Sequence, residues 1–169
     1  MSELRDVLKA IKSDIVLGPW TDEKLKNRDF PLRRSSYPLT RRWRWQVISF
    51  RADGRRFRIL AAYHTLVPEY FAILAEDVGN DSRIVARWEF HQSHAGWHIH
   101  SCCSKLDDIT VGVVHPLGVK RIPAAKNSHR RGLFVKAGFV IDDTMATAIA
   151  CHRYKVPHTL DLLSNVGLP

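Results

Sequence analysis

The stretch from Trp43 to Cys103 constrains the fold most, because it divides into short apolar or alternating runs separated by turn signals. Side chains of a strand alternate between the two faces of a sheet, and a dipeptide such as Asp-Gly between two runs favours a tight hairpin. Five strands are expected, at residues 43–52, 55–63, 69–76, 83–91 and 97–103. The run at 69–76 is short enough to be a helical turn, but the Gly79-Asn80 turn after it favours a strand. The sequence therefore predicts an antiparallel meander of about five strands.

Helical patterns are expected on both sides of this sheet. Apolar residues recur at helical spacing from Ser2 to Leu17, and Asp142 or Asp143 can cap a helix near the C-terminus. We expect helices at residues 2–17, 21–27 and 144–155, and short strands near 109–114 and 133–140, with loops over most of 105–122. The predicted fold class is α+β, and the chain is expected to form a single domain. Residues 1–42 would hold the N-terminal helix and a basic aromatic arm, residues 43–103 the sheet, and residues 104–169 a loop-rich part with the C-terminal helix.

The charge of the chain is its strongest global clue to a partner. It carries 26 Lys and Arg against 17 Asp and Glu, a net charge of +9, which favours a polyanion. Nucleic acid, RNA or DNA, is the first candidate, and an acidic protein or an anionic membrane competes with it. No apolar run is long enough to cross a bilayer and the N-terminus lacks a signal-peptide pattern, so a cytoplasmic protein without a membrane partner is expected.

The stretch R-W-E-F-H-Q-S-H-A-G-W-H-I-H-S-C-C, from Arg87 to Cys103, holds the candidate site. Alternation places polar side chains on one face of each strand of this hairpin. These are Arg87, Glu89 and His91 on the first strand and His98, His100 and Cys102 on the second. A shared apolar face requires that His91 pair with His98, Glu89 with His100 and Arg87 with Cys102. In that register the histidines and Glu89 form one cluster.

Imidazoles beside a carboxylate suit either metal binding or acid–base chemistry. The candidate catalytic residues are His98, His100, His91 and Glu89, and the candidate ligands of a divalent metal such as Zn, Mg or Mn are His98, His100, His91 and Cys102. The alternative is that these side chains form an ordinary polar, solvent-facing surface of the sheet.

Basic and aromatic residues elsewhere suit contacts with phosphates and bases. The candidate nucleic-acid-binding residues are Arg41, Arg42, Trp43 and Arg44 before the first strand, Arg87 in the hairpin, and His129, Arg130 and Arg131 in a basic loop. The alternatives are an edge strand with tryptophans facing the core and a loop of solvated charge.

Trp97-His98-Ile99-His100 resembles the hydrophobe-His-hydrophobe-His strand of HUH endonucleases, which bind a divalent metal with those histidines and cut single-stranded DNA with a tyrosine. The resemblance implies that His98 and His100 are metal ligands, with Glu89 or His91 as a third. HUH enzymes place the tyrosine on a helix with a lysine or second tyrosine one turn away, whereas Tyr154 here is followed directly by Lys155.

Arg87-Trp88-Glu89 followed by Gly96-Trp97-His98-Ile99-His100 also resembles TumE-type toxins of bacterial toxin–antitoxin pairs. These are small basic proteins with an antiparallel sheet, an Arg-aromatic-acid strand, a Gly-containing turn and a His-x-His strand. The chain is longer and lacks their Asp-Asn pair after the aromatic residue.

These patterns favour a nuclease that cleaves phosphodiester bonds with the histidine cluster, either through a divalent metal or through acid–base chemistry alone. A non-catalytic nucleic-acid-binding or assembly subunit of a phage, plasmid or defence complex, with a structural metal site, is the first alternative. A toxin or immunity component that binds an acidic protein is the second.

Overall fold

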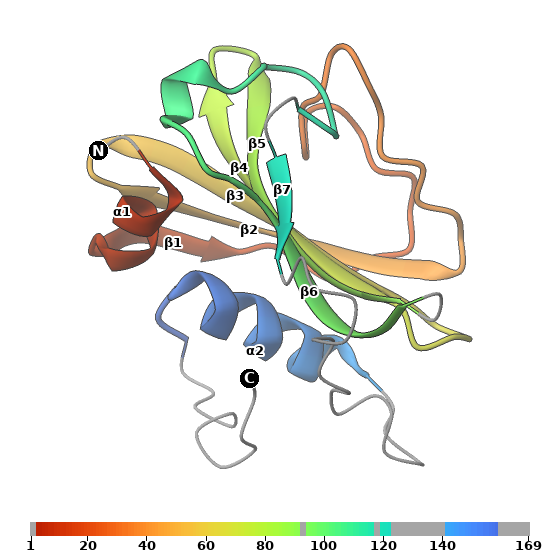
Figure 1. The fold of residues 1–169 in the computed structure, drawn as a ribbon. Helices are drawn as coiled ribbons and strands as arrows, with labels where there is room; N and C mark the ends of the chain where they lie inside the picture. The colour runs from red at the N-terminus through yellow and green to blue at the C-terminus, as the bar shows by residue number, and fades with distance from the viewer. Residues whose placement is uncertain (1–2, 92–93, 117–118, 123–140, 159–169) are drawn as a thin grey trace.

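The computed structural model describes residues 3–91, 94–116, 119–122 and 141–158. Seven antiparallel strands form one sheet in which each strand pairs with the next along the chain (Figure 1). The strands are β1 Lys12–Leu17, β2 Trp43–Ala52, β3 Arg55–His64, β4 Tyr70–Val78, β5 Asp81–His91, β6 His94–Cys102 and β7 Val119–Ile122. Two helices accompany them, α1 Leu4–Lys9 and α2 Asp143–Tyr154, with a 3₁₀ turn at Leu106–Asp108. The α+β class and the antiparallel meander are confirmed, and the sheet gains β1 and β7 at its edges.

The central strands follow the sequence pattern closely. β2 and β3 pair in register through a two-residue turn, in which both Asp53 (φ 50°) and Gly54 (φ 76°) adopt the left-handed backbone that this hairpin needs. β4 lies where the apolar run predicts a strand, and Gly79 turns the chain into β5 with φ 62°.

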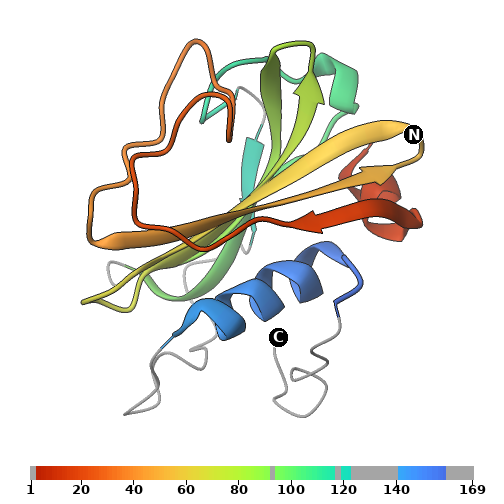
Figure 2. The same cartoon turned by 180° about the vertical axis from the view of Figure 1, so that it is seen from behind.

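Both faces of the sheet are covered, which explains why β3 and β4 carry consecutive apolar residues. One face packs against α2 and α1 through Ile59, Ala61, Tyr70 and others. The opposite face packs against residues 25–39 of the segment between β1 and β2, through Leu60, Phe71, Ile73 and others. Figure 2 shows this segment on the side of the sheet away from α2. The sheet is thus the middle of three layers.

The helix predicted at residues 2–17 is wrong beyond Lys9. The Lys12 side chain reaches back to the end of α1, where Nζ donates to the carbonyl oxygens of Val7 (2.7 Å), Leu8 (2.9 Å) and Ala10 (2.8 Å). A cation that satisfies unpaired carbonyls ends a helix favourably. The chain then enters β1, which pairs with β2 around an irregularity between Ser13 and Val16.

Two further element predictions are wrong. Residues 21–27 form no helix, because Thr21 pairs with Trp45 through two backbone hydrogen bonds (3.0 and 2.8 Å). Residues 109–114 form no strand, because their pairing is a single bridge between Val111 and Arg83 before Gly112 turns the chain at φ +83°. The short strand β7 lies instead where loops were predicted, and the strand predicted at 133–140 lies outside the described residues.

The C-terminal helix is confirmed. Asp142 is its N-cap and accepts a hydrogen bond from the Met145 backbone N–H (2.8 Å). The helix ends at Lys155, which adopts the left-handed conformation (φ 55°). Neither described helix is long and apolar enough to span a bilayer.

Candidate functional site

The register of the β5–β6 hairpin differs from the predicted one by two residues. Glu89 lies opposite His98 and Arg87 lies opposite His100, with an irregularity between Phe90 and His91. The three predicted pairs, His91 with His98, Glu89 with His100 and Arg87 with Cys102, are therefore wrong, and His91 pairs with His94. Because a shift of two residues preserves the facing of the side chains in this pairing, Glu89, His98 and His100 still share one face, whereas Cys102 lies on the core face with Trp97 and Ile99.

Glu89 is the centre of the cluster. Its Oε1 lies 2.7 Å from His98 Nε2, 3.0 Å from His100 Nε2 and 3.7 Å from His91 Nε2. Its other oxygen, Oε2, lies 2.5 Å from Arg87 Nε. Four side chains from two adjacent strands thus converge on one carboxyl group.

This environment keeps Glu89 ionised. Burial alone would raise the pKa of the carboxyl, but hydrogen bonds from His100 and His98 and the charge of Arg87 outweigh burial and hold the pKa well below its usual range. A permanent negative charge orients the neighbouring imidazoles and stabilises positive charge on them.

The three histidines differ in access to solvent. The His98 side chain is 1% exposed, whereas those of His91 and His100 are 27% and 34% exposed. The rings of His91 and His100 lie on either side of His98, with centroids 4.9 and 5.2 Å from its own. A substrate can therefore reach His91 and His100, while His98 holds Glu89 in place from within the protein.

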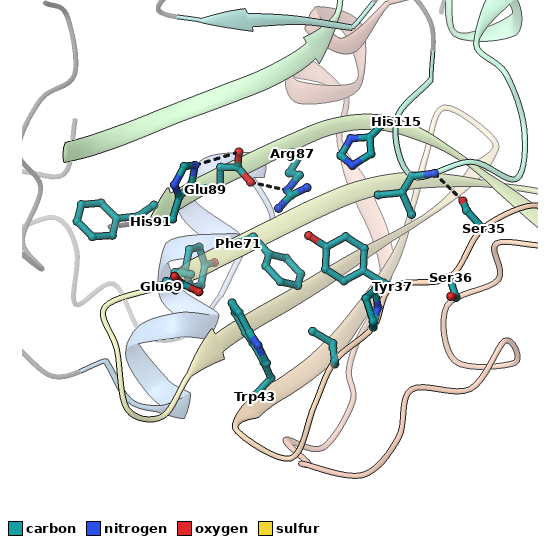
Figure 3. A pocket seen from close by; sticks show the side chains of 15 residues that line it. Ser35, Ser36, Tyr37, Trp43, Glu69, Phe71, Arg87, Glu89, His91 and His115 are labelled. Carbon is teal, nitrogen blue, oxygen red and sulfur yellow. Dashed lines mark hydrogen bonds and ion pairs between the residues drawn. The ribbon is translucent and has the colours of Figure 1, made fainter. Parts of the chain in front are cut away.

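A pocket of about 610 Å³ opens beside the cluster (Figure 3). Arg87, Glu89 and His91 line one side of it, and Tyr37, Trp43 and Phe71 line the other. The Arg87 guanidinium lies 5.3 Å from the centroid of the Tyr37 ring and 5.4 Å from that of Phe71. The site therefore combines a cation, a carboxylate and imidazoles with an aromatic wall.

Three residues of the cluster also have a geometry that suits a metal ion. Ligand atoms of Glu89, His91 and His98 lie within 4.8 Å of one another, and two histidines with a glutamate are a known zinc ligand set that leaves one position open. Cys102 is not in this group; it lies in the core cluster on the α2 side, with Sγ 3.0 Å from Ser104 Oγ. A cation at Glu89 would have to share the carboxylate with Arg87.

The other candidate residues lie in different surroundings. Arg41 and Arg42 are exposed in the turn before β2, and Trp43 is half-buried and lines the pocket. Arg44 binds Asp143 of α2 with two hydrogen bonds (2.8 and 2.7 Å), so it is engaged within the protein. His129, Arg130 and Arg131 lie outside the described residues.

Tyr154, the tyrosine considered in the HUH comparison, is buried away from the cluster. Its hydroxyl donates to the Ala72 carbonyl (2.7 Å) and accepts from the Trp88 N–H (3.2 Å), and burial raises its pKa well above the usual value. The tyrosines that line the pocket are Tyr37 and Tyr70.

Sequence reasoning did not single out Glu69, Phe71 and His115, which also line the pocket. The signal for Phe71 is indirect: β4 pairs with β5 so that Phe71 lies opposite Glu89 on the same face. Tyr37 belongs to the basic aromatic arm, but nothing in the sequence says over which strands that arm folds.

Comparisons with protein-family models, with curated proteins and with solved structures gave no significant match.

Proposed function

We propose that this protein cleaves single-stranded RNA by acid–base catalysis at the Glu89 cluster. The observation that carries the proposal is one ionised carboxylate flanked by two solvent-accessible imidazoles and an arginine, at the edge of an aromatic pocket. The net charge of +9 supports a polyanionic substrate.

RNA suits such a site because its 2′-hydroxyl is an internal nucleophile. We assign His100 as the base: its Nε2–H donates to Glu89, which leaves Nδ1 to accept the 2′-hydroxyl proton. The 2′-oxygen forms a bond to phosphorus while the bond to the 5′-oxygen breaks, and His91 donates a proton to that leaving oxygen. The products are a 2′,3′-cyclic phosphate and a 5′-hydroxyl.

Arg87 is the group that would stabilise the phosphate. Its Nε is paired with Glu89, and among the described residues no hydrogen bond reaches its two Nη atoms. A guanidinium fixed beside the reacting group favours the charge that develops on the phosphoryl oxygens. The same pair neutralises Glu89 in part, which favours the metal-free reaction over one that needs a divalent cation on this carboxylate.

The test is cleavage of a labelled single-stranded RNA and of DNA of the same sequence, with and without a chelator. We expect RNA to be cleaved to a cyclic phosphate with or without chelator and DNA to stay intact. A His100→Ala variant should lose activity. The matched control is His152→Ala, an exposed histidine of α2, which should retain it.

The second candidate is a metal-binding protein, favoured by the closeness of the Glu89, His91 and His98 ligand atoms. Loss of cleavage in chelator would replace the metal-free mechanism by a metal-dependent one. Stoichiometric bound zinc without cleavage of either nucleic acid would support a binding or assembly subunit of the cytoplasm. Tight, salt-sensitive binding of an acidic protein without either property would support a toxin or immunity component.

A further inference from the structure

The pocket beside the cluster is larger than a phosphate requires. Its volume of about 610 Å³ falls within the range of roughly 300–1,000 Å³ usual for sites that hold whole small molecules. The phosphate-handling groups occupy one side only, and the rest of the lining belongs to residues 35–39, to Trp43, to Glu69 and the start of β4, and to Phe90, Val114 and His115. The phosphate and the groups that act on it would leave this remaining part of the pocket unfilled.

The walls of the pocket suit a flat ring. The centroid of Phe71 lies 4.6 Å from that of Tyr37 and 5.3 Å from that of Trp43, and both rings are tilted to that of Phe71. Such rings, with the Arg87 guanidinium beside them, are the usual surroundings of a stacked nucleobase. Stacking alone accepts every base, because each has a π face.

Glu69 adds the group that can choose between bases. It lines the same pocket and lies with Phe71 and Trp43 around the hollow in Figure 3. Among the described residues, its hydrogen bonds run through its backbone alone, to Val67 and His64. Its carboxylate therefore has no hydrogen-bond donor within the described part of the chain and lines the pocket as an acceptor.

A carboxylate has two acceptor oxygens and, when ionised, no donor. Guanine presents two adjacent donors on its Watson–Crick edge, N1–H and the N2 amino group, which match both oxygens. Adenine and cytosine present one amino donor beside an acceptor nitrogen, and the single N–H of uracil lies between two carbonyl oxygens. Guanine is thus the base that pairs with Glu69 without placing an acceptor against it.

We infer that the pocket binds an unpaired guanine of the substrate, stacked against Tyr37 and Trp43, which cover the buried Phe71, with its Watson–Crick edge on Glu69. This rests on the proposed function, since the phosphate next to that guanine would lie at Arg87. A base in a duplex cannot offer this edge, so the substrate is single-stranded.

The first experiment measures binding without cleavage. The four nucleoside 3′-monophosphates are titrated into the intact protein and followed by calorimetry. We expect the guanine nucleotide to bind at least about tenfold more tightly than the other three, because a site built for hydrogen bonds rejects ligands that leave its groups unpaired. Glu69→Gln should lose most of this preference while its affinity for the adenine nucleotide stays within about threefold.

The matched control is Glu23→Gln, the same substitution at an exposed glutamate outside this pocket, which should keep the preference. Equal affinity of the wild type for all four nucleotides would overturn the inference, as would an unchanged preference in Glu69→Gln.

Mapping the cleavage positions in RNA separates this inference from the proposed function. Cleavage next to guanines supports both. Cleavage without regard to sequence overturns the guanine pocket and leaves the nuclease in place. Binding of the guanine nucleotide with no cleavage of RNA overturns the nuclease and identifies the pocket as a site for free guanine nucleotides.

Discussion

At the scale of single residues, Glu89 is the group on which the other members of the cluster depend. It holds Arg87 through one oxygen and the imidazoles through the other. Replacing it with glutamine removes the charge that orients His100, so we expect Glu89→Gln to lower the rate of RNA cleavage by about 10²–10⁴-fold. Single-turnover kinetics on folded protein would measure the loss. A rate within threefold of wild type would show that the carboxylate has no role in the reaction.

The low pKa of Glu89 also predicts how stability depends on pH. A carboxyl whose pKa is lower in the folded than in the unfolded chain stabilises the fold above its unfolded pKa of about 4.3, and this contribution is lost as pH falls toward the folded pKa. Between roughly pH 5 and 3, the wild type should lose more free energy of unfolding than Glu89→Gln. Urea titrations of both proteins at each pH measure the difference, and parallel curves would contradict it.

His98 and His100 should respond differently to the same substitution. His98 is fully buried and donates to Glu89, so His98→Ala leaves a cavity and removes one of the hydrogen bonds to Oε1 of the buried carboxylate, and should cost about 2–4 kcal/mol of stability as well as activity. His100 is a third exposed, so His100→Ala should cost under about 1 kcal/mol and abolish cleavage. Thermal melts and cleavage assays distinguish the two, and equal melting temperatures would contradict the assigned roles.

At the scale of elements, the first residue of α2 joins the helix to the sheet through side-chain hydrogen bonds. Asp143 accepts two hydrogen bonds from Arg44 of β2 and one from the Tyr63 hydroxyl of β3 (2.8 Å). The hydrogen bonds from Arg44 are the main reason that the pKa of Asp143 is lowered. The Arg44 and Asp143 side chains are 33% and 38% exposed, so solvent screening limits the gain.

Asp143→Asn should therefore destabilise the protein by about 1–2 kcal/mol. The neighbouring Asp142→Asn is the matched control, because asparagine caps a helix as well as aspartate and should leave stability within about 0.5 kcal/mol. Urea unfolding of the two variants measures the contrast. Similar losses of stability in both variants would mean that the negative charge near the start of α2, and not the ion pair with Arg44, stabilises the helix against the sheet.

The same scale shows how much of this structure the sequence could predict. Binary patterning located β2 to β5 within two residues of their ends and placed His98, His100 and Glu89 on one face, because facing depends on local alternation alone. The register differs from the predicted one because His91 pairs with His94, so the chain reverses earlier than the pairing of His91 with His98 requires, and the irregularity between Phe90 and His91 recovers only two of the four residues. The aromatic wall and Glu69 could not be predicted, since they depend on how the arm packs over β4.

At the scale of the whole molecule, the proposed function would use both the net charge of +9 and the polar groups of one pocket. Few of the basic side chains can reach the cluster, and several are engaged internally, as Arg55 and Arg83 are with Asp107 (3.0 and 2.8 Å). The charges that remain exposed act over a longer range. They would hold the strand at many phosphates, while the pocket selects one base and the cluster cleaves one bond.

Arg41 and Arg42 are the exposed pair nearest in sequence to the pocket residue Trp43. If each contacts one phosphate of a single strand, the Arg41→Ala, Arg42→Ala double variant should reduce the slope of log K against log salt concentration by about 1.4, since each phosphate contact contributes roughly 0.7. The matched control is Lys24→Ala, Lys26→Ala, which removes the same charge from exposed positions of the same arm. Fluorescence anisotropy with an uncleavable DNA strand at four salt concentrations gives both slopes. Equal changes in the two variants would mean that the whole positive field, and not contact at this turn, holds the strand.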